Sequence, residues 1–201
     1  DGTLCRPPTG VRKLTGIGHN KGPTMEAGRS WRKHCWIKAR ADLLPTLPIE
    51  ILRNRVRRAK ELGLDYKSYA SIRAASGHDV VAFLFSSNAL RVYAKTPDMS
   101  SDRLQKLTNI VDCHRSVAIH RPLTPISFMK NLPDQVLDHA FAAPSFTDTR
   151  GQTRDQILKQ LHGDHLPRDG VVIVGDTSQE RAWVAAARLA GYVSADQFFA
   201  P

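Results

Sequence analysis

The sequence GVVIVGDTSQERAWVAAARLAG, residues 170–191, decides the fold class of this chain. Its first part, Val171 to Val174, is a continuous apolar run between two glycines, which is typical of a strand buried on both faces of a parallel sheet. Asp176 follows where such a strand ends, and Thr177 and Glu180 have the T-x-x-E spacing of a helix capping box. The stretch therefore predicts a strand, a carboxylate at its tip, and a helix that returns along the sheet.

Similar signals recur from about residue 66 onward. Asp79 to Phe85 is a second apolar run that ends at Ser86-Ser87-Asn88, and Ser116 to His120 fits a third strand. Helices are predicted at 66–75, 101–112, 133–142 and 153–161, the last of them opened by a capping box of Thr153 and Gln156. Strands that alternate with helices predict an α/β domain, a Rossmann-like parallel sheet flanked by helices, preceded by a basic helical segment.

The positive charge of the chain is concentrated in its first third. The net charge is +10, and residues 1–75 contain 16 of the 29 Lys and Arg but only 6 of the 19 Asp and Glu. We predict an irregular basic arm at 1–28, a basic helical segment at 29–65 and the α/β domain at 66–201. Positive charge concentrated in one part of a chain indicates either a module that faces a polyanion or a solvated basic surface.

Two helices are predicted within the basic segment, at about 30–44 and 48–62. The second has an apolar stripe made of Ile49, Leu52, Val56, Ala59 and Leu62. Basic side chains cover the remaining faces of both helices, and the candidates for contact with nucleic-acid phosphates are Arg32, Lys33, Arg53, Arg57, Arg58 and Lys60. A solvated face or a protein-binding face accounts for the same pattern.

Several classes of protein do not fit the sequence. The longest apolar run, Val80 to Phe85, is far shorter than the roughly 20 residues that a membrane-spanning helix needs. No signal-peptide pattern is present. The three cysteines, Cys5, Cys35 and Cys113, are scattered and odd in number, which argues for reduced thiols in an intracellular compartment, cytoplasmic or organellar.

Residues 170–191 also resemble the fourth motif of the haloacid dehalogenase-like superfamily, in which Gly-Asp follows a strand and a second acid comes four residues after the first. The resemblance implies that Asp176 and Glu180 hold Mg²⁺. The stretch FLFSSN, residues 83–88, resembles the second motif, which makes Ser87 the ligand of a phosphoryl oxygen. Arg121-Pro-Leu-Thr-Pro125 resembles the third motif, with Arg121 in the place of a charge-balancing lysine.

The first motif of that superfamily is matched only by its end. Asp1-Gly2-Thr3-Leu4 resembles this end, and the resemblance makes Asp1 the general acid/base. The nucleophilic aspartate and its strand are then expected before residue 1. With them, the resemblance implies a phosphatase-like hydrolase that works by covalent phosphoryl transfer. Without them, it implies a scaffold that has lost its chemistry.

Three function hypotheses stay open at this point. The first is a haloacid dehalogenase-like domain, covering about residues 66–195, that handles a phosphate-bearing ligand with Mg²⁺. The second is a non-enzymatic nucleic-acid-binding or assembly protein that uses the basic helices, with a protein partner as a variant. The third is a purely structural subunit. The capping box alone accounts for Glu180 without any metal.

Overall fold

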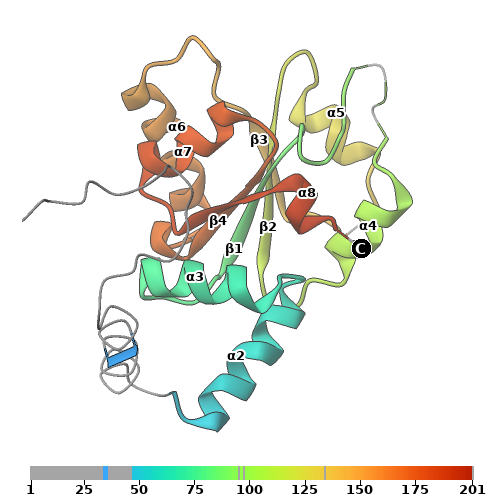
Figure 1. The fold of residues 1–201 in the computed structure, drawn as a ribbon. Coiled ribbons are helices and arrows are strands. Elements are labelled where there is room, and N and C mark those ends of the chain that lie inside the picture. The colour runs from blue at the N-terminus through green and yellow to red at the C-terminus, as the bar shows by residue number, and fades with distance from the viewer. Residues whose placement is uncertain (1–33, 36–46, 95, 97, 134, 201) are drawn as a thin grey trace, which may run out of the picture. The chain divides into compact units, whose positions relative to one another are not determined.

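Five parallel strands form the centre of the structure, a computed structural model that describes residues 34–35, 47–94, 96, 98–133 and 135–200. They are β1 (Ala82–Ser86), β2 (His114–Ile119), β3 (His139–Ala142), β4 (Val171–Gly175) and β5 (Gly191–Ser194), paired in the order β3-β2-β1-β4-β5. Figure 1 shows this sheet between layers of helices. The predicted α/β, Rossmann-like fold is confirmed.

In the described region, two helices precede β1, and after β1 the strands alternate with helices. The helices are α2 (Ile49–Glu61), α3 (Tyr66–Ser76), α4 (Ser101–Thr108), α5 (Pro125–Lys130), α6 (Arg150–Gly163), the 3-10 turn η1 (Arg168–Gly170), α7 (Ser178–Ala187) and α8 (Ala195–Phe198). Contacts divide the chain into Asp1–Thr46 and Leu47–Pro201, and all of these elements belong to the second unit. The contact boundary thus falls inside the predicted 29–65 segment, and α2 belongs with the α/β part.

Each face of the sheet has its own apolar core, because side chains alternate along every strand. On β1, Phe83 and Phe85 point into one core, while Ala82 and Leu84 point into the other. The first core is covered by α3, α4, α5 and α8, and the second by α6 and α7. Phe198 of α8 completes the first core by packing edge-on against Phe83, with ring centroids 5.3 Å apart.

Two predicted elements are wrong in type or position. The segment predicted as a helix at 133–142 ends in a strand, β3, whose four residues pair with Ser116 to Ile119 of β2. This segment forms a strand because β2 offers it an edge to pair with, and local sequence does not reveal the presence of such an edge. The capping box of α6 is formed by Thr149 and Gln152, four residues earlier than predicted. Thr153 instead lies inside the helix and is buried.

Helix α2 is attached to the sheet by its second half. Ala59 and Leu62 of the predicted stripe are buried, whereas Ile49 and Leu52 are exposed. Arg58 crosses to the loops at the amino ends of β1 and β2, where its guanidinium donates to three backbone carbonyls, those of Val80, Val111 and Asp112. The predicted arm at 1–28 and most of the predicted helix at 30–44 lie outside the described residues, as do Asp1, Arg32 and Lys33.

None of the helices in the described ranges is long and apolar enough to cross a bilayer.

Candidate functional site

The strand order places one topological switch point between β1 and β4. From β1 the chain continues to β2 and β3 on one side, and from β4 it continues to β5 on the other. In open α/β sheets, ligands bind in the crevice outside the carboxyl ends of the strands at such a point. Here Ser87 and Asn88 follow β1 and Asp176 follows β4, so the predicted residues Ser87 and Asp176 flank the switch point.

The first turn of α7 begins at this point with a complete capping box. The hydroxyl of Thr177 accepts from the backbone N–H of Glu180, and the carboxylate of Glu180 accepts from the N–H of Thr177 at 2.9 Å. The same carboxylate oxygen also accepts from the N–H of Asp176 at 2.6 Å. Gly175 permits this close packing, because a Cβ there would lie 2.9 Å from that oxygen. The capping box predicted from the spacing of Thr177 and Glu180 is therefore confirmed.

The carboxylate of Glu180 is fully buried, and its second oxygen is also engaged. The side-chain amide of Asn88 donates to Oε1 at 2.9 Å, and His120 Nε2 lies 3.7 Å from the same oxygen. A buried carboxylate is costly unless its lone pairs are met by donors. Three N–H donors meet those of Glu180, so its role in this arrangement is to join α7 to the end of β1.

His120 connects this carboxylate to Ser87. The Ser87 hydroxyl accepts from the backbone N–H of His120 at 3.1 Å and lies 3.0 Å from its Nδ1. Which of these two atoms donates depends on the imidazole tautomer, and with the proton on Nε2 the ring presents an N–H toward Glu180. Ser87, His120 and Glu180 thus form a chain in the order of a Ser-His-acid triad. Ser87 is only 1% exposed, however, so no substrate reaches its hydroxyl in this arrangement.

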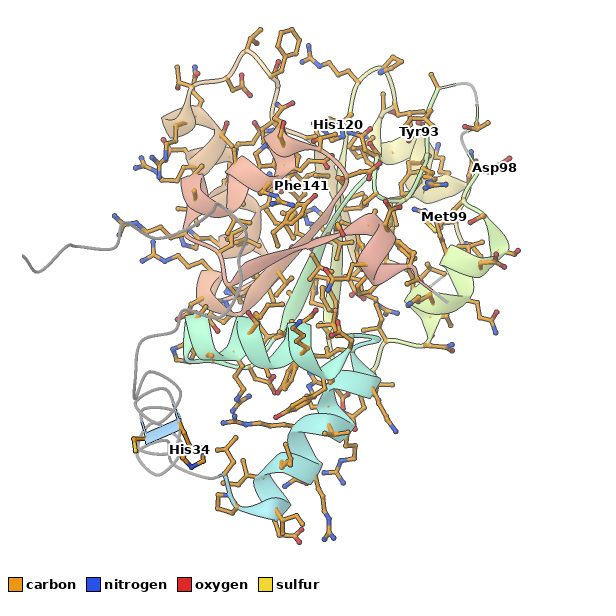
Figure 2. All side chains as sticks on the ribbon, viewed as in Figure 1. His34, Tyr93, Asp98, Met99, His120 and Phe141 are labelled. Atoms are coloured by element: carbon orange, nitrogen blue, oxygen red, sulfur yellow. The ribbon has the colours of Figure 1, made fainter. Side chains whose placement is uncertain are left out.

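The imidazole of His120 lies beyond the end of β2, where Figure 2 labels it. It stacks on the indole of Trp183, with ring centroids 5.8 Å apart and an angle of 17° between the ring planes. Burial lowers the pKa of His120 below its ordinary value, and the Glu180 carboxylate partly offsets this by favouring the charged form. The direction of the shift favours a neutral imidazole.

The described side chains do not fit the Mg²⁺ ion that the resemblance implies. Mg²⁺ needs oxygen ligands in near-octahedral positions. Asp176 is exposed and has a carboxylate to offer, but both oxygens of Glu180 already accept hydrogen bonds from N–H groups. No three His, Cys, Asp or Glu side chains within the described ranges are grouped so that they could hold a metal ion. A metal at Glu180 would have to displace N–H donors from a carboxylate that has no exposed surface.

The topology also limits where a nucleophile could be. A strand presenting an aspartate from before residue 1 has no place beside β4, because β1 and β5 occupy its two edges. The strand beside β4 at the switch point is β1, and it ends in Ser86, Ser87 and Asn88 without a carboxylate. The Ser86 hydroxyl is also engaged, since it accepts from the N–H of Ala89 at 2.9 Å.

Arg121, the predicted charge-balancing residue, follows His120 and is exposed. It makes no hydrogen bond or ion pair with the described residues, so it does not join Ser87 in the network around Glu180. His120 and Asn88 take that position instead. Sequence reasoning assigned neither of them to this site, although both come directly after buried strands, where the side chains of a parallel sheet converge. Their positions at the ends of buried strands were the signal that could have identified them.

The basic residues of α2 differ in their environments. Arg53 and Arg57 are exposed and pair with acidic residues of the same helix, Glu50 and Glu61. Lys60 is exposed as well. Arg58 is only 18% exposed, and its donors are used inside the fold. The surface that α2 offers to a polyanion therefore consists of Arg53, Arg57 and Lys60, with two of the three partly neutralised.

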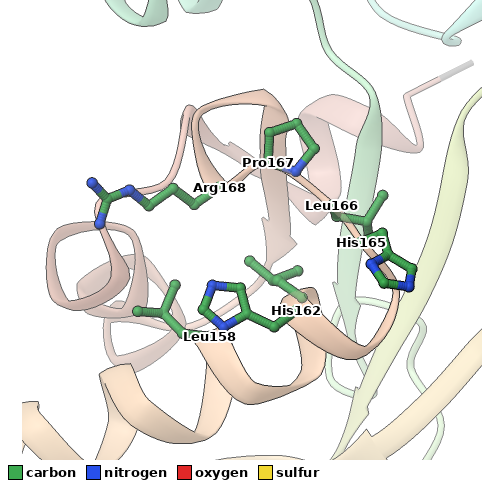
Figure 3. A pocket seen from close by; sticks show the side chains of 7 residues that line it. Leu158, His162, His165, Leu166, Pro167 and Arg168 are labelled. Atoms are coloured by element: carbon green, nitrogen blue, oxygen red, sulfur yellow. The ribbon is translucent and has the colours of Figure 1, made fainter.

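Two of the cavities near α6 lie at opposite ends of the strands. One, of about 690 Å³, is formed by the end of α6 and the segment before β4, with His162, His165 and Arg168 at its wall (Figure 3). It lies toward the amino ends of the strands, away from Asp176. The other, of about 330 Å³, lies between α7 and the segment that follows β3, and Gln179 and Trp183 line it.

Comparison of the chain with models of known protein families and with curated proteins finds no match.

Proposed function

We propose that this chain is a haloacid dehalogenase-like domain that binds a phosphate-bearing ligand at the switch point between β1 and β4 and does not hydrolyse it. The observation that carries the proposal is the engagement of Glu180. Its carboxylate closes the helix cap and accepts from Asn88, so the second acid of the motif that the sequence resembles serves as a structural joint. No carboxylate stands opposite Asp176 at the end of β1 to act as a nucleophile.

Hydrogen-bond donors around this point support an anionic ligand. The backbone N–H groups of Ser178 and Gln179 start α7 and have no acceptor among the described residues, as is usual in the first turn of a helix. His120 near Glu180 is partly exposed, and Asn88 has a second amide proton to donate. The exposed carboxylate of Asp176 opposes an anion at the same place.

Because the Asp176 carboxylate repels an anion, removing its charge should change the phosphate affinity in a predictable direction. If Mg²⁺ at Asp176 held the phosphate, Asp176→Asn would weaken binding. In the metal-free site proposed here, Asp176→Asn removes a like charge and tightens the binding of inorganic phosphate about 3- to 10-fold. Isothermal titration calorimetry in the presence of EDTA measures this change. Asp155→Asn, which removes an exposed carboxylate on α6, is the matched control and leaves the affinity unchanged.

Hydrolysis is tested separately with p-nitrophenyl phosphate and Mg²⁺, and no turnover above the rate without protein is expected. Turnover that disappears in Asp176→Asn would contradict the loss of catalysis. Failure of the wild-type chain to bind phosphate, with or without Mg²⁺, would contradict the ligand site.

Nucleic-acid binding through α2 is the competing outcome. It predicts an affinity that falls steeply as salt rises and that is lost in the triple variant Arg53→Ala/Arg57→Ala/Lys60→Ala. If the phosphate binds at the switch point, the triple variant and the wild-type chain should have the same affinity for inorganic phosphate.

A further inference from the structure

The cavity of about 330 Å³ beside α7 begins at the same helical turn as the proposed phosphate site. One face of α7 forms its floor, with Gln179, Ala182, Trp183 and Ala186 at the spacing of successive helical turns. Residues 179 to 186 extend about 10 Å along the helix axis. The cavity therefore runs from the first turn of α7, where the N–H groups of Ser178 and Gln179 are open, along the side of the helix.

The opposite wall presents an aromatic ring that packs against little else. Phe146 lines the cavity and is 86% exposed. Its backbone is held by a tight turn in which the Asp148 carboxylate accepts from the N–H of Ser145 at 2.7 Å and the Ser145 hydroxyl accepts from the N–H of Thr147. A phenyl ring kept in water on an ordered turn leaves a large apolar surface uncovered, and a ligand that covered it would gain free energy.

A side-chain hydroxyl on the cavity wall is available to a ligand. Thr153 of α6 is 7% exposed and lines the wall, and its hydroxyl makes no hydrogen bond to any described residue. This hydroxyl can donate a hydrogen bond to a ligand atom in the cavity or accept one from it. The side-chain amide of Gln179 adds a donor and an acceptor at the end nearer the phosphate site.

The walls are fixed relative to each other before any ligand binds. Arg150, the first residue of α6, donates to the backbone carbonyl of Ala185 on α7 at 2.9 Å, and Gln156 of α6 donates to the carbonyl of Ala142 at the end of β3. These bonds hold α6, α7 and the end of β3 together, so the width of the cavity is set in advance. A preformed cavity lowers the ordering cost of binding.

We propose that this cavity binds the flat heteroaromatic ring of the phosphate-bearing ligand, so that the ligand class is a nucleoside monophosphate. Small side chains on one wall and a phenyl ring on the other accept a planar group between them. Thr153 and Gln179 supply hydrogen bonds to ring heteroatoms. The inference rests on the proposed function for the position of the phosphate, at the start of α7, and adds the identity of the group attached to it.

The test uses a chain in which Trp31→Phe and Trp36→Phe leave Trp183 as the sole tryptophan. Trp183 is 2% exposed and lines the cavity, so its emission, excited at 295 nm to avoid absorption by the base, reports on a ring that enters. The probes are AMP, adenosine, ribose 5-phosphate and inorganic phosphate. Because stacking of one base on an aromatic side chain is worth about 5- to 100-fold in affinity, AMP should bind tighter than ribose 5-phosphate by such a factor.

Two variants test whether the tighter binding of AMP arises in this cavity. Phe146→Ala removes an exposed side chain and should reduce the affinity for AMP and adenosine at least about 5-fold, with binding of inorganic phosphate unchanged. Thr153→Val keeps the shape of the side chain, removes the unpartnered hydroxyl and should weaken AMP in the same selective way. Ile126→Ala, a truncation of another exposed apolar residue on α5, is the control and changes neither affinity.

The outcomes separate this inference from the proposed function. Equal affinities for AMP and ribose 5-phosphate, insensitive to Phe146→Ala, would overturn the ring subsite and leave the phosphate site standing. Adenosine binding that depends on Phe146, with no contribution from phosphate, would support the ring subsite and overturn the phosphate site. Absence of any change in Trp183 emission and of any heat with all four probes would overturn both.

Discussion

The side-chain amide of Asn88 donates a 2.9 Å hydrogen bond to the carboxylate of Glu180, residues 92 positions apart in the chain. This bond spans the switch point and fixes the end of β1 to the first turn of α7. Because Glu180 is fully buried, Asn88 is also one of the donors that make its charge tolerable inside the fold.

Replacing Asn88 should therefore cost stability in a graded way. Asn88→Ala leaves one oxygen of the buried carboxylate without its amide donor and should lower the free energy of unfolding by about 2 kcal/mol. Asn88→Asp has nearly the same shape but places a second carboxylate against the first, so it should cost at least about 1 kcal/mol more at pH 7. Urea denaturation measures both, and the gap between them should narrow at pH 4.5 as the new carboxyl takes up a proton. Equal losses at pH 7 would contradict a direct contact between the side chain at position 88 and the Glu180 carboxylate.

His120 should make stability depend on pH. Its folded-state pKa is below the ordinary value of 6.5, mainly because burial disfavours the charged imidazole. The unfolded chain therefore binds the proton first as the pH falls. The contribution of neutral His120 is fully present above pH 6.5 and is lost as the pH falls from 6.5 through the folded-state pKa.

The His120→Gln variant should show a smaller drop in Tm between pH 7.5 and pH 5.5 than the wild-type chain. The control is His162→Gln, at an exposed position on α6, which should keep the wild-type pH dependence. Identical pH profiles for the wild-type chain and His120→Gln would rule out His120 as the source.

Arg58 should act as a structural residue although it belongs to a basic helix. Arg58→Ala removes the donors of the Val80, Val111 and Asp112 carbonyls and should lower the free energy of unfolding by about 2 kcal/mol. Arg57→Ala, one position earlier on the same helix, removes an exposed side chain and should change it by no more than about 0.5 kcal/mol. Similar losses in the two variants, measured by chemical denaturation, would contradict the role of Arg58.

Gly175 is required by the close approach of its neighbours. A Cβ at this position would lie 2.8 Å from the ring of Tyr192 and 2.9 Å from the bonded carboxylate oxygen of Glu180. Gly175→Ala should thus cost about 1–3 kcal/mol, since neither neighbour is free to move without losing a packed or bonded position. At Gly163 a Cβ would meet nothing within 4 Å, and Gly163→Ala should leave Tm unchanged or raise it slightly. The paired Tm values check the prediction, and a neutral Gly175→Ala would contradict it.

Much of the fold could be predicted from local sequence, and the strands that were missed share one physical cause. The apolar runs at Val80–Phe85 and Val171–Val174 are buried on both faces, so their composition alone identifies strands β1 and β4. The edge strands β3 and β5 are four residues each and only partly buried. They are strands because a neighbour offers them a pairing edge, and that edge exists only in the folded chain.

The residues of the candidate site also fall into those that local sequence reveals and those that it does not. The capping box of Thr177 and Glu180 is a local device, and its spacing revealed it. The engagement of Glu180 by Asn88 and the position of His120 depend on the strand order, which brings the ends of β1, β2 and β4 together. Sequence reasoning therefore identified Glu180, but not the side chains of Asn88 and His120 that lie against its carboxylate.

The depth of the Glu180 carboxylate also determines how the protein responds to ionic strength. Mobile ions screen charges that face water, such as Arg53 and Glu50 on α2, within about 10 Å at 0.1 M salt. They do not reach a carboxylate with no exposed surface, whose counter-charges are N–H dipoles of its own backbone and one amide. Added sodium chloride should consequently weaken the surface ion pairs while the joint between β1 and α7 keeps its strength, so this end of the sheet is insulated from the salt of its surroundings.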